Sequence, residues 1–468
     1  MKNRIPSMVE RVTPCAPFNA PNPTRGAHGV TRPTTANDLR GARREWIAIL
    51  FLLFLLSGLT AQITCFAGEN RKNFDRPFLE SELIFPLEHL HNHGSCIVEC
   101  PNGDWLVCWY RGSGERWADD VAVMGARKRK GDRQWSAPFV LADTPGYPDT
   151  NPAMFIDPQS RLWLIWPTIL DNRWESALLK CRIASSYQKP GPPDWESSEV
   201  LHVTPGTNFP ALVNAGLDRL AAGPAPQMKS EEFAKWLQAN RARVQDRLTC
   251  RLGWMTRVHP FVLDSKRLIV PLYSDGFDFC LMAISDDWGK SWFTSHPIVG
   301  LINSQPSLVR KKNGTLVAYM RDDGPPPQRI PISESTDRGV TCSPVGDSDR
   351  PDSGAGVEVI ALKSGRWLLI NNDLDEGRHR LGVALSADEG KSWPWLRHLE
   401  QDTPADVKAG AGSYHYPSAI QANDGTIHVS YSFHQKKSET KPDAAGRPAS
   451  ESIKHARFNE SWVMQGDP

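Results

Sequence analysis

Pairs of short apolar segments separated by turn residues recur along the chain from His91 onward. The turns contain Gly, Asn, Asp or Pro, as in Pro101-Asn102-Gly103-Asp104. Apolar runs bounded in this way are typical of β-strands joined by tight turns. The pattern predicts six strand pairs, at residues 95–99 and 105–110, 153–156 and 162–166, 260–263 and 268–273, 307–309 and 316–320, 357–362 and 367–370, and 418–422 and 427–431. We therefore expect an all-β protein built from repeated sheets.

Two segments depart from this pattern. Between residues 204 and 250, Ser230 stands in an N-cap position and precedes Phe233, Trp236 and Leu237 at helical spacing. This spacing predicts a helical insertion rather than a seventh repeat. Residues 436–450 are polar and are expected to form a long loop within the last repeat.

A second repeat is visible as a motif, Ser-x-Asp-x-Gly-x-x-Trp. It begins at Ser285 and at Ser386, and a copy beginning at Ser335 has Cys342 in place of Trp. The copies start about 50 residues apart, which indicates a repeat architecture. We expect the Asp carboxylate to accept backbone N–H groups, the Gly to adopt a positive φ, and the Trp to pack under the turn. The motif is thus interpreted as a structural turn and not as a catalytic site.

These motifs are Asp-boxes (bacterial neuraminidase repeats), and the chain resembles the sialidase family over roughly residues 85–460. The resemblance implies a six-bladed β-propeller, which we place at residues 80–462 with the helical insertion at about 204–250. Residues 453–458 are expected to be the outer strand of the last blade. A strand near residues 83–85 is expected to complete that blade and close the ring.

The N-terminal part differs in character from the repeats. Residues 1–45 are rich in Pro, Thr, Asn and Arg without hydrophobic periodicity, which predicts disorder. Arginines then precede an apolar run, and residues 46–67 resemble a signal peptide or a single membrane anchor. In either case we expect an exported protein, secreted or periplasmic, or held at a membrane by residues 46–67.

Composition narrows the choice of partners. The chain has 54 Lys and Arg against 53 Asp and Glu, a formal net charge of +1, so no nucleic-acid partner is expected. No cofactor motif is present, and no His/Cys spacing is typical of a metal site, so neither cofactor nor metal is predicted. The three cysteines at 96, 100 and 108 are interpreted as buried small hydrophobes. We expect a monomer.

Polar residues stand immediately before each inner strand of the predicted blades. They are His93, Asn151, His259, Gln305, Glu358 and Tyr416, and Arg257 stands two residues before His259. Because inner strands of a propeller start at its axis, these side chains are expected to converge at one mouth of the central tunnel. The alternative is that they only cap strands and fill the tunnel with hydrogen bonds.

The resemblance to sialidases implies roles for several of these residues. Tyr416 matches the nucleophile, and Glu358 on the neighbouring blade matches the base that takes its proton. The loop after the second strand of blade 1 supplies Arg111 and then Asp119 or Asp120 as acid/base; a solvated charged loop is the alternative for this segment. Three arginines are expected to hold a substrate carboxylate, because guanidinium groups bind carboxylates bidentately. Those arginines are Arg111, Arg257 and Arg321.

One departure from the family keeps other functions open. Sialidases open blade 1 with Arg-Ile-Pro, whereas this chain has His93-Gly94-Ser95. A His facing a carboxylated sugar suits a polysaccharide lyase that abstracts the proton α to a uronate carboxylate, and His93, His259, Tyr416 and Arg257 satisfy that requirement. The first reading is an exo-α-sialidase-like glycoside hydrolase acting on an acidic glycan. The alternatives are the uronate lyase and a non-catalytic glycan-binding propeller.

Overall fold

The structure is a computed structural model that describes residues 76–224 and 228–468. The segments expected to be disordered (1–45) and to form a signal peptide or anchor (46–67) lie outside the described residues. Within the described ranges, none of the helices is both long and apolar enough to cross a membrane.

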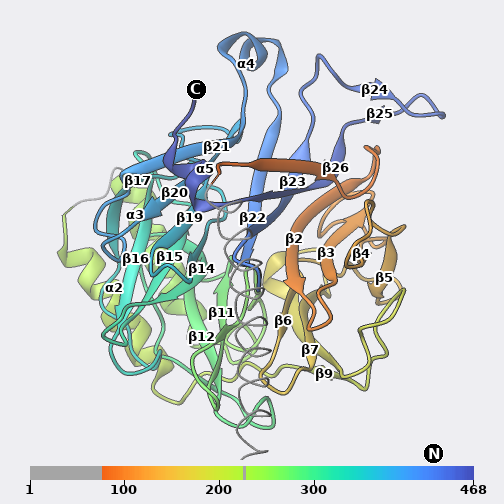
Figure 1. Cartoon of the computed structure of the whole chain (residues 1–468). Coiled ribbons are helices and arrows are strands. Elements are labelled where there is room, and N and C mark those ends of the chain that lie inside the picture. Colours follow the sequence, from red (N-terminus) through yellow and green to blue (C-terminus); the bar gives the residue numbers. More distant parts are fainter. Residues whose placement is uncertain (1–75, 225–227) are drawn as a thin grey trace, which may run out of the picture. The chain divides into compact units, whose positions relative to one another are not determined.

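The described residues form a six-bladed β-propeller, which confirms the predicted fold class (Figure 1). Each blade is a four-stranded antiparallel sheet. Blade 1 contains β2 (His91–Glu99), β3 (Trp105–Gly112), β4 (Ala122–Lys128) and β5 (Phe139–Ala142). Blade 2 contains β6 (Ala153–Ile156), β7 (Leu162–Ile169), β8 (Ala177–Ala184) and β9 (Ser197–Val200). Blade 3 contains β10 (Phe261–Val262), β11 (Leu268–Ser274), β12 (Phe279–Ser285) and β13 (Phe293–Thr294).

The remaining blades follow the same plan. Blade 4 contains β14 (Asn303–Arg310), β15 (Leu316–Asp322), β16 (Arg329–Ser335) and β17 (Gly346–Pro351). Blade 5 contains β18 (Glu358–Ala361), β19 (Trp367–Asn371), β20 (Arg380–Ser386) and β21 (Trp395–Gln401). Blade 6 contains β22 (Ser413–Gln421), β23 (Ile427–His434), β26 (Glu451–Phe458) and β1 (Leu79–Leu83). Strands such as β11 and β12 are buried along their whole length because each lies between two neighbouring sheets.

The ring is closed by the first described strand, which pairs with the last. β1 runs antiparallel to β26, with Leu79 opposite Phe458. The closing strand was expected at 83–85 and lies at 79–83, and β26 is the third strand of blade 6 rather than the outer one, because β1 covers its edge.

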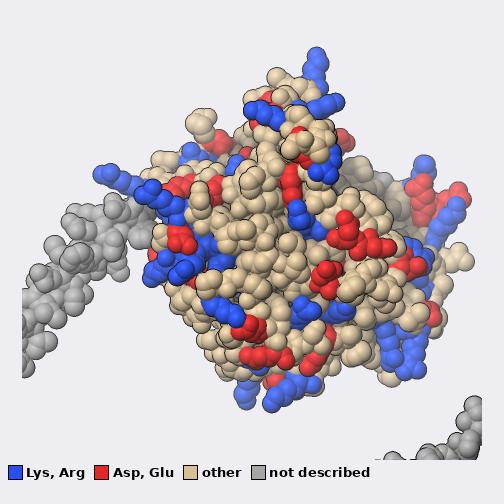
Figure 2. Space-filling view, turned by 90° about the vertical axis from the view of Figure 1, so that its right-hand side faces the viewer, with Lys and Arg blue, Asp and Glu red and all other residues tan. Residues whose placement is uncertain are grey.

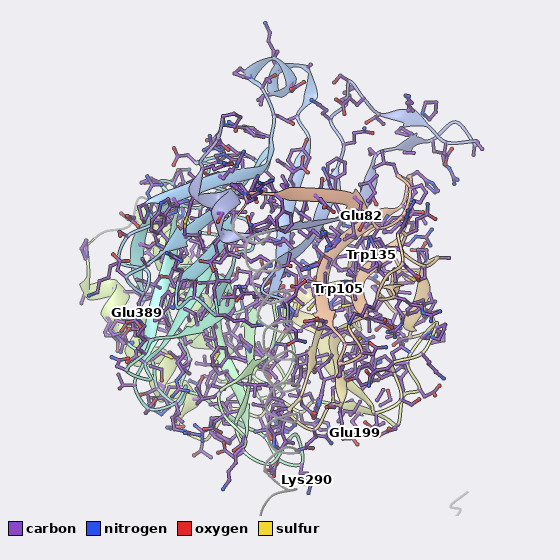
Figure 3. The ribbon with its side chains drawn as sticks, in the orientation of Figure 1. Glu82, Trp105, Trp135, Glu199, Lys290 and Glu389 are labelled. Atoms are coloured by element: carbon purple, nitrogen blue, oxygen red, sulfur yellow. The ribbon has the colours of Figure 1, made fainter. Side chains whose placement is uncertain are left out.

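Side chains then join blade 6 to blade 1 (Figure 3). Glu82 of β1 accepts hydrogen bonds from Lys128 Nζ at 2.6 Å and Trp135 Nε1 at 3.1 Å. The Trp105 ring stacks on His428 of β23, with 3.7 Å between ring centroids. The contacts of Glu82 and Trp105 therefore tie the first and last blades together beside the closing strand.

The Asp-boxes are structural turns, as the motif predicts. In the copy beginning at Ser386, the Asp388 carboxylate accepts from the backbone N–H of Ser392 at 2.9 Å, and Ser386 Oγ accepts from the N–H of Gly390 at 2.8 Å. Gly390 has a φ of 82°. Equivalent bonds are present in the other two copies.

The predicted helical insertion is present between blades 2 and 3 as α2 (Phe209–Ala222) and α3 (Ser230–Arg243). Ser230 is the first residue of α3 and not its N-cap, which is Lys229. α2 packs Phe209, Val213 and Leu217 into the core cluster that contains Trp254. The insertion is thus anchored on the flank of blade 3.

Short elements complete the described chain. They are η1 (Trp174–Ser176), α4 (Pro404–Gly410), β24 (Lys441–Pro442), β25 (Pro448–Ala449) and α5 (Glu460–Met464). The segment expected to be a loop at 436–450 contains the small β24–β25 ribbon, which projects from blade 6 in Figure 1. Figure 2 shows basic and acidic side chains interspersed over the face in view, without an extended field of one sign.

Candidate active site

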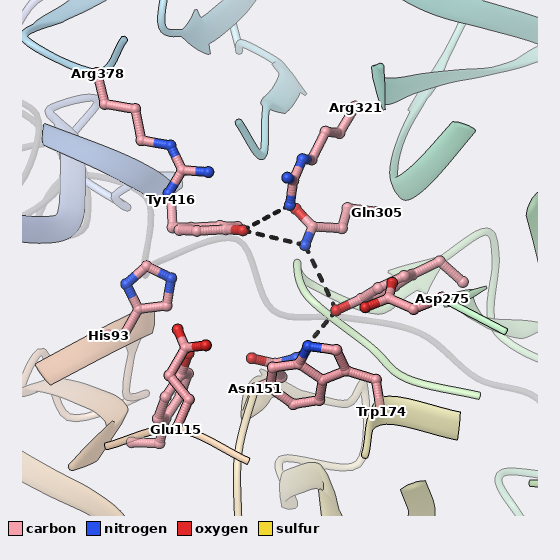
Figure 4. A pocket seen from close by; sticks show the side chains of 11 residues that line it. His93, Glu115, Asn151, Trp174, Asp275, Gln305, Arg321, Arg378 and Tyr416 are labelled. Atoms are coloured by element: carbon pink, nitrogen blue, oxygen red, sulfur yellow. Dashed lines mark hydrogen bonds between the residues drawn. The ribbon is translucent and has the colours of Figure 1, made fainter. Parts of the chain in front are cut away.

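A polar cavity of about 300 Å³ lies at the propeller axis (Figure 4). Five of its lining residues were predicted from the sequence: His93, Asn151, Gln305, Arg321 and Tyr416. Six others were not predicted to line it: Tyr110, Glu115, Trp174, Tyr273, Asp275 and Arg378. The cavity thus brings together residues from all six blades. Blade 5 contributes Arg378, which lies in the loop that follows β19.

Irregularities in the inner strands turn several side chains toward the axis. The pairing shifts register between Ser304 and Ser307 in β14 and between His415 and Ser418 in β22. Within these bulges, Gln305 has a φ of 49° and Tyr416 a φ of 54°, and Asn151 before β6 has a φ of 42°. Non-glycine residues at positive φ are strained and gather at functional sites. The strain therefore favours a site role over simple strand capping.

Blade 1 differs at this position. Its register shift lies between His93 and Cys96, and the residue with positive φ is Gly94, at 61°. The residue of blade 1 that is equivalent to Tyr416 of blade 6 is therefore Gly94. His93, which was predicted to be equivalent to Tyr416, lies one position earlier in the strand. A Cβ on Gly94 would meet Tyr110 at 3.0 Å, so the glycine leaves room beside the Tyr110 ring.

The Tyr416 side chain is surrounded by guanidinium groups. Its hydroxyl accepts a hydrogen bond from Arg321 Nη1 at 2.8 Å and a longer one from Gln305 Nε2 at 3.4 Å. Arg257 and Arg378 lie against its ring, with Cζ 4.8 and 5.4 Å from the centroid. Burial opposes the charged form of Arg321, but the nearby Tyr416 and Asp323 outweigh it and raise the Arg321 pKa. Arg321 is thus a permanent cation beside the phenol.

Asp275 follows β11 and contributes a carboxyl group to the cavity. Asp275 is an exposed residue that lines the open cavity. Partial loss of solvent in the cavity, together with the Asp323 carboxylate, raises the Asp275 pKa to about 7, although Arg321 acts in the opposite direction. A carboxyl group with such a pKa carries a proton for transfer near neutral pH.

Glu115 is the second carboxylate of the cavity and is paired with His91. His91 Nε2 lies 3.2 Å from Glu115 Oε1, and its Nδ1 lies 3.1 Å from Glu451 Oε2. Because a carboxylate can only accept, both ring nitrogens carry protons. Burial opposes this charge, but the two carboxylates raise the His91 pKa to about 9. Tyr110 donates its hydroxyl to Glu115 at 3.2 Å.

The expected pairing of Glu358 with Tyr416 is not present in the structure. Glu358 is buried, and its carboxylate contacts His259 Nδ1 and the Ala419 N–H, each at 2.6 Å. His259 Nε2 donates to the Ile97 carbonyl at 2.8 Å. With acceptors on both nitrogens, His259 is cationic: burial opposes the charge, but the Glu358 carboxylate helps to raise its pKa. Glu358 and His259 form an ion pair between blades and do not line the cavity.

The predicted arginine cluster is only partly formed. Arg257 is buried under the Tyr416 ring, where its Nη2 donates to the Pro417 carbonyl at 2.7 Å. Arg111 forms a bidentate pair with Glu88, at 2.6 and 2.7 Å, and does not line the cavity. Arg378 lines the cavity beside Tyr416, although it was not one of the three predicted arginines. The ion pair with Glu88, which lies 23 residues away in the chain and which the sequence pattern did not reveal, accounts for the position of Arg111.

The acid/base residues expected in the blade 1 loop also lie outside the cavity. Asp119 is exposed and accepts from Asn172 at 3.0 Å. Asp120 is exposed and accepts from the backbone N–H of Ser113 at 3.1 Å, which stabilises the loop. The same loop instead directs Glu115 inward. Arg321, which lies near the end of β15, was predicted from its place after a second strand and lines the cavity, whereas Asp275, which follows β11, lines it without having been predicted.

Comparison with known proteins agrees with the architecture. A family model described as a BNR repeat-like domain matches residues 103–225 and 227–429. The chain belongs to this family. No curated protein sequence matches the chain.

Solved structures similar to this BNR repeat-like protein include known sialidases. A Dyadobacter fermentans protein of unknown function has a TM-score of 0.59 and 14% identity, covering 82% of this chain and 98% of its own. The leech intramolecular trans-sialidase has a TM-score of 0.57 and 12% identity, covering 82% and 71%. The NanB sialidase of Streptococcus pneumoniae has a TM-score of 0.56 and 13% identity, covering 82% and 71%. At these identities the likeness establishes the fold.

Proposed function

We propose that this BNR repeat-like protein is a glycoside hydrolase of the exo-α-sialidase type that acts on a carboxylated glycan. The observation that carries the proposal is the position of Tyr416 in the cavity, with Arg321 bonded to its hydroxyl and Arg378 against its ring. A tyrosine among arginines suits a substrate with a carboxylate next to the reacting carbon. The sialidases among the structural neighbours support the same reaction class.

In this proposal Arg321 and Arg378 bind the substrate carboxylate. Guanidinium groups form two parallel hydrogen bonds to a carboxylate, which fixes its orientation as well as its charge. Arg378 Nη2 donates to the Gly354 carbonyl at 2.9 Å, which holds its side chain over Tyr416. The cavity volume of about 300 Å³ suits one terminal sugar residue.

The proposed reaction needs a nucleophile and a general acid, and the cavity contains a residue for each role. The Tyr416 oxygen attacks the anomeric carbon, the glycosidic C–O bond breaks, and Asp275 gives its proton to the leaving oxygen. The phenol proton passes to Glu115, the other carboxylate that lines the cavity. In the second half, water attacks the anomeric carbon and gives a proton to Asp275. The bond between the sugar and the Tyr416 oxygen breaks, and Glu115 returns its proton to that oxygen.

Turnover of fluorogenic substrates tests the proposal. The purified chain is assayed with 4-methylumbelliferyl α-N-acetylneuraminide and with the matching glucuronide and galacturonide. We expect hydrolysis of at least one of them, and a loss of at least about 10³-fold in kcat for Tyr416→Phe. Tyr147→Phe is the matched control, because Tyr147 is 43% exposed and does not line the cavity. Unchanged turnover in Tyr416→Phe would reject Tyr416 as the nucleophile.

A uronate lyase is a second candidate because of two specific observations. Glu358 is paired with His259 and does not contact Tyr416, and the His93 ring lies 4.3 Å from the Tyr416 ring. Burial and neighbouring histidines lower the His93 pKa well below its usual value, so His93 is a neutral imidazole that can accept a proton. Product mass separates the two reactions: hydrolysis adds one water, whereas elimination leaves an unsaturated uronate without added water.

Binding without turnover is the third outcome of the same experiment. If acidic oligosaccharides bind and no product of either mass forms, the protein is a glycan-binding propeller and the hydrolase proposal is wrong. In that case Tyr416→Phe is expected to leave affinity unchanged, because the hydroxyl of Tyr416 bonds to Arg321 within the protein and its reactivity is not needed for binding.

We also propose that the protein is exported. The support is the arginine-flanked apolar run at residues 46–67. Fractionation of cells that express the full chain, followed by N-terminal sequencing of the mature product, tests this. Export with a new N-terminus near residue 68 supports a cleaved signal; an intact chain in the membrane fraction supports an anchor; recovery from the cytosol rejects export.

A further inference from the structure

Three histidines from the first and last blades converge beside the cavity. His93 lies on β2, His415 on β22 and His434 at the end of β23. Each can present one ring nitrogen within 4.8 Å of the corresponding atoms of the other two. The His415 ring centroid lies 4.7 Å from that of His93 and 5.0 Å from that of His434. The cluster therefore spans the seam where the ring closes.

Each of these rings has a buried nitrogen without a hydrogen-bond partner among the residues that the structure describes. They are Nδ1 of His93, Nδ1 of His415 and Nε2 of His434. His93 is 6% exposed and His415 is 2% exposed. Buried polar atoms in folded proteins are nearly always paired, so three unpaired nitrogens in one cluster indicate a shared ligand.

We propose that His93, His415 and His434 bind a divalent transition-metal ion, of which zinc fits the ligand set best. Three neutral imidazoles are a common zinc site that leaves a fourth position open. Ligand nitrogens of a tetrahedral zinc site lie about 3.3 Å apart, so the rings need to approach by at most about 1.5 Å.

The protonation state of the cluster agrees with metal binding. Burial lowers the pKa of His93, His415 and His434, and the neighbouring cations act in the same direction. All three rings are therefore neutral, which is the form that binds a metal. Among the charged groups around them, the His91 and Arg378 cations disfavour a further cation, whereas the Glu451 carboxylate favours it.

Glu451 completes the surroundings of the site. Its Oε2 lies 3.3 Å from His434 Nε2, outside hydrogen-bond geometry, and 3.1 Å from His91 Nδ1. His91, His434 and Glu451 also lie close together, but His91 carries protons on both ring nitrogens and is therefore not a ligand. Carboxylates next to metal-binding histidines orient the rings or take the open position. Glu451 is suited to either role here.

A metal at this position has two consequences for the protein. It links β2 of blade 1 to β22 and β23 of blade 6, which adds a cross-link at the ring closure. It also places a positively charged ion next to His93, whose ring contacts the Tyr416 ring. A metal on His93 takes the lone pair that a lyase base needs, so an occupied site favours the hydrolase. The site itself rests on the histidine geometry and is independent of the proposed reaction.

Titration of the full chain with cobalt(II) and zinc tests the inference. Protein is purified without a polyhistidine tag, treated with chelator and dialysed. We expect one equivalent of cobalt(II) to give visible absorption bands of four-coordinate cobalt, and zinc to displace it. His434→Gln, at the least buried of the three positions, is expected to weaken binding at least tenfold. His202→Gln is the matched control, since His202 is exposed and far from the cluster in sequence.

Thermal unfolding provides a readout that does not depend on activity. A ligand that binds only the folded state raises Tm, and the rise grows with the logarithm of the ligand concentration divided by its Kd once the site is mostly filled. At the same zinc concentration we expect the Tm of the wild type and of His202→Gln to rise equally, and that of His434→Gln to rise less. If wild-type protein binds no cobalt(II) or zinc, or if His434→Gln binds as tightly as His202→Gln, the inference is wrong. Neither result depends on whether glycans are hydrolysed.

Discussion

Arg321 donates a hydrogen bond of 2.8 Å from Nη1 to the Tyr416 hydroxyl and thereby joins blade 4 to blade 6 across the axis. Asp323 holds the other end of the guanidinium, with 2.5 Å between Arg321 Nη2 and Asp323 Oδ1. The phenol oxygen is thus positioned by a cation that is itself fixed. This arrangement, which neither blade can form alone, is the centre of the proposed site.

Arg378→Lys tests recognition of the substrate carboxylate. Lysine keeps the charge but loses the planar pair of donors, so we expect kcat/KM to fall about 10- to 100-fold, mainly through KM. Arg173→Lys is the control, because Arg173 lies in an exposed loop with its side chain 70% accessible. Steady-state kinetics on the best substrate from the panel measure the effect. An unchanged KM would remove Arg378 from the carboxylate site.

Asp275 is expected to control the basic limb of the pH profile. Its pKa of about 7 lies above the usual range, and the proposed acid acts only when protonated, so kcat/KM should fall as pH rises through about 7. Asp275→Asn should lower kcat about 10²- to 10⁴-fold and abolish that limb. The exposed Asp171→Asn is the control. Persistence of the same limb in Asp275→Asn would assign it to another group.

The Asp-box beginning at Ser386 is expected to contribute to stability and not to catalysis. Ser386 is buried, and its Oγ accepts from the Gly390 N–H, so Ser386→Ala leaves that donor unpaired. We expect a loss of about 1–3 kcal/mol in the free energy of unfolding, measured by urea denaturation. Lys391→Ala in the same exposed turn should change it little. A selective loss of kcat in Ser386→Ala at full stability would contradict the structural role.

Glu82 is expected to make the ring closure sensitive to acid. Burial opposes its charge, but His455 and Lys128 outweigh it and lower the Glu82 pKa from its ordinary value of 4.5 to about 2. Its stabilising effect is thus fully present above pH 4.5 and is lost as pH falls toward 2. Glu82→Gln should destabilise the protein at pH 7 by about 1 kcal/mol or less.

The comparison of Glu82→Gln with wild type across pH checks this sign. The difference in Tm should shrink as pH falls below 4.5, because the wild-type carboxylate is then being neutralised. Glu80→Gln on the same strand is the control, since Glu80 pairs with Arg457 at the exposed edge. A difference that grows at low pH would contradict the assignment.

Sequence alone was sufficient for the fold and for part of the site. The strand pairs and Asp-boxes are local patterns, in which residues that interact lie close together in the chain, so their structure follows from propensity and turn chemistry. The sequence predicted three residues of the cavity because a polar residue before proline at the start of an inner strand points toward the axis of a propeller. These residues are Asn151, Gln305 and Tyr416. His93 reached the cavity although Gly94 holds the equivalent position.

Tertiary structure decided the partners of the charged groups, because these come from strands remote in the chain. Arg111 pairs with Glu88 and Glu358 with His259, and these contacts remove both from the roles that the family resemblance implied. Asp275 and Arg378 enter the cavity through loop geometry that spacing does not encode. The cluster of His93, His415 and His434 exists only because β1 closes the ring and brings the first and last blades together.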